Sequence, residues 1–469
     1  MTKSEINPSK IFVIICLFWG FLYAFLSPPF TAADEISHFW KIYMLSEGSF
    51  GNSVLTSDVL LGVPTGKILN QSGEYIPFGM VKAGYKNINL RGTQGVKTSF
   101  DNTKEILSYP LEKGNKVFNT FPVPSYTVLS YLPSVILMKL MTIANINPGI
   151  MLYILRIVSL ITYTALIYTA ITLTPTKKWL FAALALMPTS IYQASTVNTD
   201  GITIGFGFIF AAFTLYLAFN EKVKQITTKQ TALYILVLTC FLICKFAYAP
   251  MIFLFFLIPS HKFENKKQQY TIFSIILLMT IYITAGYYLY TRLLIKASDD
   301  VFAQNMYFYT LFHNPTIFIK AMLYTLIVEM KYFLVGFIGL FGWGECRIPA
   351  IAGYLYYFVL ISFALCNLKT DLKTTIFSLT DKLSFIFIYI TYTIFLCTIL
   401  FLVFGISHTG KLICHFGRYY IPIAPVLFLT LHNNKLPALK TNILPYINIC
   451  IINLILFTGL VSIMLRFYQ

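Results

Sequence analysis

The sequence predicts an all-α polytopic membrane protein, and composition is the first observation that points to this class. Of the 469 residues, 57% are hydrophobic and 11% are charged, and the mean hydropathy is +0.71. Soluble domains carry roughly 25% charged residues. Repeated apolar stretches are the second observation, and their number predicts about eleven transmembrane helices. The short alternating segments of an outer-membrane β-barrel do not occur in the sequence.

Basic residues set the predicted orientation. The net charge of +17 would fit a nucleic-acid-binding protein, but the Lys residues lie mainly in short loops between apolar segments. The positive-inside rule places basic residues in just such cytoplasmic loops, and no soluble segment carries a basic face with interleaved aromatics. Lys3 and Lys10 therefore hold the N-terminus in the cytoplasm, and the first span, 11–26, leads to the outer face.

The later apolar segments follow the same rule. Segment 231–259 is basic on both sides, so we split it at Lys245 into two short helices that form a hairpin. Segment 315–341 is interrupted by Glu329 and Lys331 and is predicted to be a surface or re-entrant helix on the outer side. The other predicted spans are 11–26, 148–173, 180–197, 201–219, 270–292, 351–366, 383–404, 419–431 and 442–465, and they leave the C-terminus outside.

A polar stretch, 28–148, separates the first two spans and is far too long for a simple connector. We predict that it forms an extracytoplasmic lobe within a single integral membrane domain, 1–469. Turns are expected between residues 48 and 119, where Gly, Asn and Thr recur. A helix over 125–141 is expected to lie in the membrane interface.

The start of this lobe shows a helical period. Apolar residues recur every three or four positions, at Ile36, Phe39, Trp40, Tyr43 and Met44. Asp34, His38 and Lys41 fall on the opposite face. The pattern predicts an amphipathic helix that lies in the interface with Asp34 in its first turn.

Asp34 and Glu35 are the candidate catalytic residues, with Asp34 the stronger of the two. They are the only charges between Lys10 and Lys41, directly after the first span. One interpretation is a general base or metal-binding carboxylate at an interfacial cavity. The other is an acidic first turn, capped by Thr31, that complements the helix dipole. The residues alone leave both interpretations open.

Three cations are candidates for binding an anionic head group. Arg156 lies about two turns inside its span, where an arginine is costly unless it has a partner. Lys245 stands at the break of the predicted hairpin, and Arg418 opens a span on the outer side. The alternatives are outward snorkelling for Arg156 and simple interface anchoring for Lys245.

Two polar residues could support the site. His38 follows Asp34 by one helical turn and could share a ligand or a hydrogen bond with it. Asp200 precedes Gly201 and is either a helix N-cap or a supporting acid. Two residues do not make a metal site, so no metal ligands are assigned, and a divalent metal ion is left open as a cofactor.

Cysteine usage adds little to the assignment. Cys346 and Cys414 fall in predicted outer loops, where a disulfide between them is one outcome. The other six lie in apolar runs and behave as small hydrophobes; they are Cys16, Cys240, Cys244, Cys366, Cys397 and Cys450.

The acids and cations converge on the outer boundary, which favours an enzyme acting on a lipid-linked phosphate. Sugar transfer from a polyprenyl phosphate needs a carboxylate to deprotonate the acceptor hydroxyl and cations to neutralise the departing phosphate. Phosphate leaves readily, so the proton-donating second carboxylate of a glycosidase is not required. Asp34 with Arg156, Lys245 and Arg418 has this composition.

Several short motifs resemble a bacterial family of multi-spanning proteins catalogued as domain of unknown function 2142. They are Pro28-Pro29, Asp34-Glu35-Ile36-Ser37-His38-Phe39, Asn198-Thr199-Asp200-Gly201, Lys245-Phe246-Ala247-Tyr248-Ala249-Pro250, Gly339…Gly342-Trp343 and Gly417-Arg418-Tyr419-Tyr420. This family is similar to membrane glycosyltransferases of the type C (GT-C) fold. The resemblance implies a catalytic acid after the first helix, hence Asp34, and polyprenyl-phosphate sugars as donors.

The expected function is a glycosyltransferase of the bacterial cytoplasmic (inner) membrane that acts at the extracytoplasmic face. Its partners would be a polyprenyl-phosphate-linked sugar, an envelope glycan or lipid-linked acceptor, and membrane lipid, with no nucleic acid. One alternative is a transporter or flippase of lipid-linked saccharides, although no internal repeat typical of transporters is evident. Another is a non-catalytic subunit of a polysaccharide assembly complex.

Overall fold

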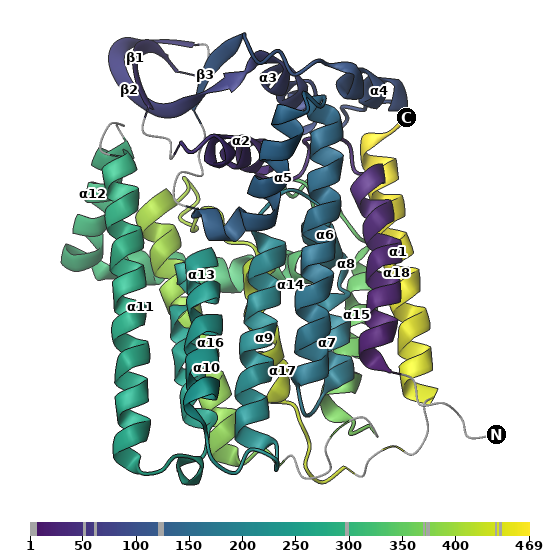
Figure 1. The fold of residues 1–469 in the computed structure, drawn as a ribbon, viewed down its shortest axis with the longest axis vertical. Coiled ribbons are helices and arrows are strands. Elements are labelled where there is room, and N and C mark those ends of the chain that lie inside the picture. The colour runs from purple at the N-terminus through teal and green to yellow at the C-terminus, as the bar shows by residue number, and fades with distance from the viewer. Residues whose placement is uncertain are drawn as a thin grey trace.

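The protein consists of a helical body with a mixed lobe at one end (Figure 1). The computed structural model describes residues 7–49, 53–60, 63–120, 126–295, 300–368, 371, 376–436, 439 and 443–469. In Figure 1 the helices of the body run mostly along the long axis, and the lobe covers their upper ends. We refer to this end of the molecule as the lobe end.

Six helices of the described chain are long and apolar enough to cross a membrane, and the bent pair α12–α13 would make a seventh. The six are α1 (Pro8–Leu26), α6 (Pro148–Leu173), α9 (Asp200–Phe219), α11 (Lys266–Ile295), α16 (Leu379–Phe404) and α18 (Ile443–Phe467). They confirm a polytopic helical membrane protein. The predicted count of about eleven is not reached, because the remaining apolar segments form short or broken helices.

Proline accounts for one broken span. Segment 180–197 forms α7 (Lys178–Ala185) and α8 (Pro188–Ala194), and both helices are buried within the body. Pro188 lacks the N–H that would continue the first helix, so a new helix starts there. α8 then leads into α9 through the turn at 195–199.

The predicted break at Lys245 is confirmed. α10 (Thr228–Cys244) ends there, and a 3₁₀ helix, η3 (Phe246–Leu257), follows. The chain returns to the level at which α10 began, because Ile226 N–H donates to the Lys262 carbonyl at 2.8 Å. The two segments therefore form a hairpin whose tip is Lys245.

The segment after α11 is irregular, as its charges indicate. α12 (Asp300–His313) and α13 (Pro315–Val328) meet at a bend of 99°, and α14 (Met330–Gly339) begins directly after Glu329. A two-stranded ribbon joins α14 to α15 (Ala350–Leu365); its strands are β4 (Leu340–Phe341) and β5 (Cys346–Arg347). The predicted span 419–431 is instead η5 (Gly417–Ile423) followed by α17 (Ala424–Leu429).

The lobe contains a sheet that the all-α class did not include. The antiparallel order is β1-β2-β3, with Ser53 opposite Gly73 and Tyr75 opposite Phe118. The elements of the lobe are α2 (Glu35–Ser46), β1 (Ser53–Leu60), β2 (Val63–Pro77), α3 (Phe78–Tyr85), η1 (Ile88–Leu90), α4 (Phe100–Ser108), β3 (Lys116–Thr120), η2 (Val128–Tyr131) and α5 (Leu132–Ile143).

α2 lies where the apolar period predicts it, but its surroundings differ from the prediction. It was expected to lie in the interface with one face in water. Instead, both of its faces are buried in the core of the lobe, including His38 and Lys41. Burial lowers the pKa of Lys41 to about 8. The prediction fails because later parts of the lobe, which periodicity cannot anticipate, cover the polar face.

The C-terminal end of α18 is attached to the lobe. Thr98 N–H donates to the Phe467 carbonyl at 2.7 Å, Arg466 donates to the Val96 carbonyl at 3.0 Å, and the rings of Phe100 and Tyr468 stack at 4.6 Å. α1 begins at the opposite end of the body (Figure 1). The first long helix therefore starts, and the last one finishes, at opposite ends of the body.

Cys346 and Cys414 are both free thiols, so the disulfide considered from the sequence is not formed. Cys346 is buried on β5 and Cys414 is half-buried before η5. Burial raises the pKa of the Cys414 thiol, and the charge of Asp34 adds to the effect.

Candidate functional site

The loop between α1 and α2 presents Asp34 in a strained backbone. Phe30 and Asp34 are non-glycine residues with φ of 62° and 60°, the left-handed region that bulky side chains avoid. Asn87 donates to the Pro29 carbonyl at 2.9 Å, and Arg91 donates to the Phe30 carbonyl through Nε and Nη2, each at 3.1 Å. These bonds from the lobe fix the loop, so Asp34 is held half-buried in one position.

Arg156 is the main anchor of this loop. Its guanidinium on α6 donates to Glu35 through Nε at 2.8 Å and through Nη2 at 2.7 Å. Nη1 donates to the carbonyls of Ala24 and Ser27, and Nη2 also donates to that of Pro28. These contacts use all five N–H groups of the guanidinium. Both charged side chains have an exposure of 0%.

The Glu35 carboxylate also has hydrogen-bond partners within the protein. Its Oε1 also accepts from the Val197 N–H at 3.1 Å, so the carboxylate ties α2 to the turn before α9. This bidentate pair uses every guanidinium donor and is fully buried, so neither side chain is available to a substrate. The structure thus separates Arg156 and Glu35 from the other candidates, and the geometry favours a positioning role for both.

Asp200 lies at the first turn of α9, but another residue caps that helix. The Asn198 side-chain oxygen accepts from the N–H groups of Asp200 and Gly201, at 2.8 and 3.4 Å. The Asp200 carboxylate is therefore free to face two cations. Its oxygens lie 3.8 Å from Lys245 Nζ and 3.5 Å from Arg418 Nε. Three candidates from distant parts of the sequence meet here.

Tight backbone packing positions Arg418. A Cβ on Gly417 would lie 2.5 Å from both the Phe333 carbonyl and the Phe337 nitrogen of α14, so only glycine fits. Two tyrosine hydroxyls hold the next residue: Tyr248 and Tyr392 donate to the Tyr419 carbonyl at 2.9 and 2.6 Å. The motif Gly417-Arg418-Tyr419 is thus locked against α14, η3 and α16.

Lys245 and Arg418 have donors available for an anion. Arg418 Nε is buried without a hydrogen-bond partner among the described residues. Their contacts with Asp200 are at ion-pair distance, and their exposures are 18% and 15%. The Tyr419 ring lies beneath both cations, 4.1 Å from Lys245 Nζ and 5.4 Å from the Arg418 guanidinium carbon. A buried donor without an acceptor is costly, which indicates a place for a ligand oxygen.

Asp34 belongs to the same electrostatic cluster. Its charge favours the protonated form of Arg418, together with the charge of Asp200. His38 lies among these groups, and its Nδ1 is 2.5 Å from the Tyr131 hydroxyl. Burial lowers the pKa of His38 to about 4, against the opposing effects of Asp34 and Asp200. The histidine is therefore neutral near pH 7. We call Asp34, His38, Asp200, Lys245 and Arg418 the lobe-end cluster.

The residues alone did not identify Arg91, Tyr126 and Tyr419 as members of the site. Tyr126 packs against the His38 ring at 5.3 Å between centroids, and burial together with the charges of Asp200 and Asp34 raises its pKa. Tyr419 follows Arg418 in the same motif, and this position could have identified it as a site residue. Nothing in the sequence near Arg91 or Tyr126 distinguishes them from other polar residues of the lobe.

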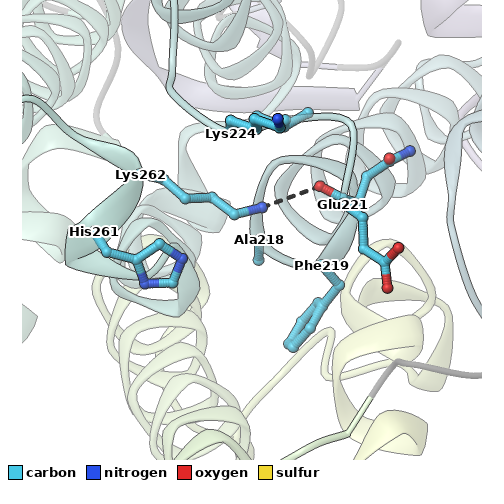
Figure 2. A pocket seen from close by; sticks show the side chains of 8 residues that line it. Ala218, Phe219, Glu221, Lys224, His261 and Lys262 are labelled. Carbon is cyan, nitrogen blue, oxygen red and sulfur yellow. Dashed lines mark hydrogen bonds between the residues drawn. The ribbon is translucent and has the colours of Figure 1, made fainter.

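Figure 2 shows a cavity of about 460 Å³ whose lining includes no residue of this cluster. It is lined by Phe219, Lys224, His261 and Lys262 among others, at the C-terminal end of α9. Asp200 begins that helix, so the cavity and the cluster are roughly 30 Å apart along its axis. Lys262 Nζ donates to the Leu217 and Asn220 carbonyls, which caps the end of α9. The position of Lys262 at this cavity is therefore explained by its role in capping α9.

Metal-binding geometry is not found in the described part of the chain, where no group of three or more His, Cys, Asp or Glu side chains could hold an ion. No curated protein matches this sequence, and no solved structure matches it either. The family model described as "Predicted membrane protein (DUF2142)" matches residues 17–427. The match includes the α1–α2 loop and every member of the lobe-end cluster. The chain therefore belongs to this family of predicted membrane proteins.

Proposed function

We propose that the protein is a membrane glycosyltransferase that moves a sugar from a polyprenyl-phosphate donor to an envelope glycan or lipid-linked acceptor. The observation that carries this proposal is the lobe-end cluster. It combines a half-buried carboxylate, Asp34, with two cations, Lys245 and Arg418, that meet Asp200 at ion-pair distance; Arg418 Nε has no hydrogen-bonded acceptor among the described residues. A carboxylate beside unsatisfied cations is what acceptor activation and phosphate binding require.

Lys245 and Arg418 would bind the phosphate of the donor. Arg418 offers a planar fork of donors and Lys245 a compact charge. Before the donor arrives, Asp200 balances their charge at 3.5 and 3.8 Å. Because those contacts are longer than a charge-assisted hydrogen bond, phosphate oxygens could form shorter ones without removing Asp200. The Tyr419 ring would keep both cations oriented toward the ligand.

Asp34 would act as the general base. It accepts the proton of the acceptor hydroxyl as that oxygen attacks the anomeric carbon of the donor sugar. The bond from the anomeric carbon to the phosphate oxygen breaks, and polyprenyl phosphate leaves with the electron pair. The attack comes from the side opposite the phosphate, so the anomeric configuration inverts. His38, which is neutral, would help to orient the Asp34 carboxylate without adding charge to the cluster.

Arg156 and Glu35 would position the base rather than bind the donor. Their buried pair holds the carbonyls at the end of α1 and ties α2 to the turn before α9. An error of about 1 Å in the position of a catalytic group can cost about a hundredfold in rate. The supporting contacts of this loop therefore matter to the proposed chemistry.

The proposed location is the bacterial cytoplasmic membrane, with the lobe end facing the extracytoplasmic side. Support comes from the Lys-rich loops, which the positive-inside rule assigns to the cytoplasm. A divalent metal ion remains part of the proposal only as an optional cofactor. The reaction as written does not need one.

The test is reconstitution of the full chain in liposomes. A radiolabelled polyprenyl-phosphate sugar is supplied with a membrane extract that contains envelope glycans and lipid-linked saccharides. The proposal predicts release of free polyprenyl phosphate and label in the acceptor fraction. Label that crosses the bilayer on an intact donor would support a flippase instead. Donor binding with neither outcome would support a non-catalytic subunit and overturn the enzymatic proposal.

A further inference from the structure

The hairpin between β4 and β5 carries an exposed tryptophan that the proposed donor chemistry leaves unexplained. Trp343 is 43% exposed, whereas Trp19, Trp40 and Trp179 are 7%, 2% and 4% exposed. The sequence contains four tryptophans, and all four lie in the described residues. Trp343 is thus the single solvent-accessible indole of the protein.

Hydrogen bonds fix the backbone of the hairpin around Trp343. The backbone N–H of Trp343 donates to Glu345 Oε2 at 2.6 Å, the Tyr332 hydroxyl donates to the Gly344 carbonyl at 3.0 Å, and the Gly342 N–H donates to the Tyr192 hydroxyl at 3.2 Å. Gly342 has φ of 62°, and a Cβ there would lie 2.5 Å from Glu345 Oε1. Glycine therefore lets the Glu345 carboxylate fold back over the turn. A tryptophan side chain has few rotatable bonds, so it offers a large contact area at little entropic cost.

Arg91 stands beside this indole and joins it to the α1–α2 loop. Its guanidinium carbon lies 5.9 Å from the centre of the Trp343 ring. Nε and Nη2 of the same guanidinium hold the Phe30 carbonyl, four residues before Asp34. Burial lowers the pKa of Arg91, and the charges of Glu35, Asp34 and Glu345 oppose this effect. Asp34 is therefore the carboxylate that acts on both Arg91 and Arg418.

Glu345 supplies an unsatisfied acceptor at the same place. Its Oε1 is buried and has no hydrogen-bond partner among the described residues, while Oε2 accepts from the Trp343 backbone N–H. Burial raises the pKa of this carboxyl. At this place an exposed apolar ring and guanidinium donors lie beside a buried carboxyl oxygen that has no hydrogen-bond partner among the described residues. Sugars have apolar C–H faces edged by hydroxyls that both donate and accept, so they match this combination.

We infer that Trp343, Arg91 and Glu345 form a binding surface for an uncharged saccharide, which serves as the acceptor subsite. The sugar ring lies on the indole, and its hydroxyls bridge Arg91 and Glu345. This places the acceptor beside the part of the α1–α2 loop that Arg91 holds at Phe30, while the donor phosphate occupies the side of Lys245 and Arg418. The assignment of this surface as the acceptor subsite rests on the proposed function. The inference that the surface binds a saccharide does not rest on that function.

The test uses the fluorescence of the full chain in detergent micelles. Because Trp343 is the accessible indole, acrylamide should quench its emission selectively. The probes are the methyl glycosides of glucose, galactose, mannose and N-acetylglucosamine. At least one of them should protect the emission from acrylamide in a saturable manner, and Trp343→Phe should remove the quenchable signal.

Two variants give the specificity control. Glu345→Gln keeps the size of the side chain but loses the charge, and should weaken protection about tenfold, equivalent to about 1.4 kcal/mol. Asp101→Asn changes an exposed acid of α4 whose contact is with Lys104, and should leave protection unchanged. Equal protection in wild type and Glu345→Gln would overturn the proposed role of Glu345.

Two results would overturn the inference as a whole. One is that no glycoside protects Trp343. The other is that brominated acyl chains, and not acrylamide, quench it in bilayers, which would make Trp343 a lipid-interface anchor. Protection without any sugar transfer would support the saccharide surface and refute the glycosyltransferase. Sugar transfer without protection would support the glycosyltransferase and refute the saccharide surface.

Discussion

Two arginines illustrate how residue environment separates structure from function. Arg156 and Arg418 have the same chemistry and both were expected to bind phosphate. Arg156 is enclosed at 0% exposure with every N–H bonded, whereas Arg418 Nε is buried without a hydrogen-bond partner. An arginine that is fully satisfied by the protein stabilises it, and one that is not is available to a ligand.

This difference predicts opposite phenotypes for two matched variants. Arg156→Met leaves the Glu35 carboxylate buried and unpaired, which should lower the free energy of unfolding by about 3–5 kcal/mol. Arg418→Met should cost far less stability but should abolish binding of polyprenyl phosphate. Thermal unfolding and lipid binding are measured on both purified variants. Equal stability loss in the two proteins would contradict the distinction.

His38 predicts how stability depends on pH. Burial lowers its pKa from 6.5 to about 4, so between these values the unfolded state binds more protons than the folded state. The resulting contribution is fully present above pH 6.5 and is lost as pH falls toward 4, by about 3 kcal/mol. His38→Asn retains a partner for the Tyr131 hydroxyl but cannot titrate, and should flatten this part of the curve.

The measurement is the unfolding midpoint across that pH range for wild type and His38→Asn. His408 is exposed, so His408→Asn serves as the matched control and should follow the wild-type curve. If His38→Asn shows the same slope as wild type, the buried imidazole is not the source of the acid sensitivity.

At the scale of elements, the site depends on how closely η5 approaches α14. Gly417→Ala would place a methyl group 2.5 Å from two backbone atoms of α14, and that helix cannot yield as a side chain would. We expect a stability loss of about 1–3 kcal/mol and displacement of Arg418. Gly286→Ala is the control, because it has open space around it. Donor binding that is unchanged in Gly417→Ala would contradict the proposed packing role.

The sequence anticipates single elements better than broken ones. α6 matches the predicted bounds 148–173, because a long apolar run needs no partner to define it. The break at Lys245 follows from charges on both sides. The sheet was missed because residues 53–77 lack a clear alternation of apolar and polar side chains. The burial of α2 was missed because its polar face is covered by residues distant in the sequence.

The candidate site was predictable in composition but not in arrangement. Scarce charge at the lobe end identifies Asp34, Lys245 and Arg418, and the structure brings them into one electrostatic cluster with Asp200 and His38. Their roles stay predictions. The pairing of Glu35 with Arg156 joins residues 121 positions apart, and no local pattern reveals it.

For the molecule as a whole, polar contacts at two places help to attach the lobe to the body. One attachment is the Arg156–Glu35 pair, and the other is the end of α18. Arg466 donates to the carbonyls of Leu90, Thr93 and Val96. The position of the lobe therefore depends on α18, which lies far from the lobe in the sequence.

Arg466→Gln should therefore loosen the lobe without unfolding the helices. We expect faster proteolysis within the lobe at an unchanged helical circular dichroism signal, because the lost bonds lie at the lobe margin. Leu465→Ala is the control, since that side chain is 71% exposed and its carbonyl contact with Lys97 is kept. Equal proteolysis rates for wild type and Arg466→Gln would refute this attachment.

The most direct test of the account compares Asp34→Asn with wild type in the reconstituted transfer reaction. Asparagine tolerates the left-handed backbone at this position, so the loop should keep its shape. The account predicts unchanged affinity for the polyprenyl-phosphate donor and a rate of sugar transfer reduced by about 10²–10⁴-fold. Transfer by Asp34→Asn at the wild-type rate would contradict the assignment of Asp34 as the base.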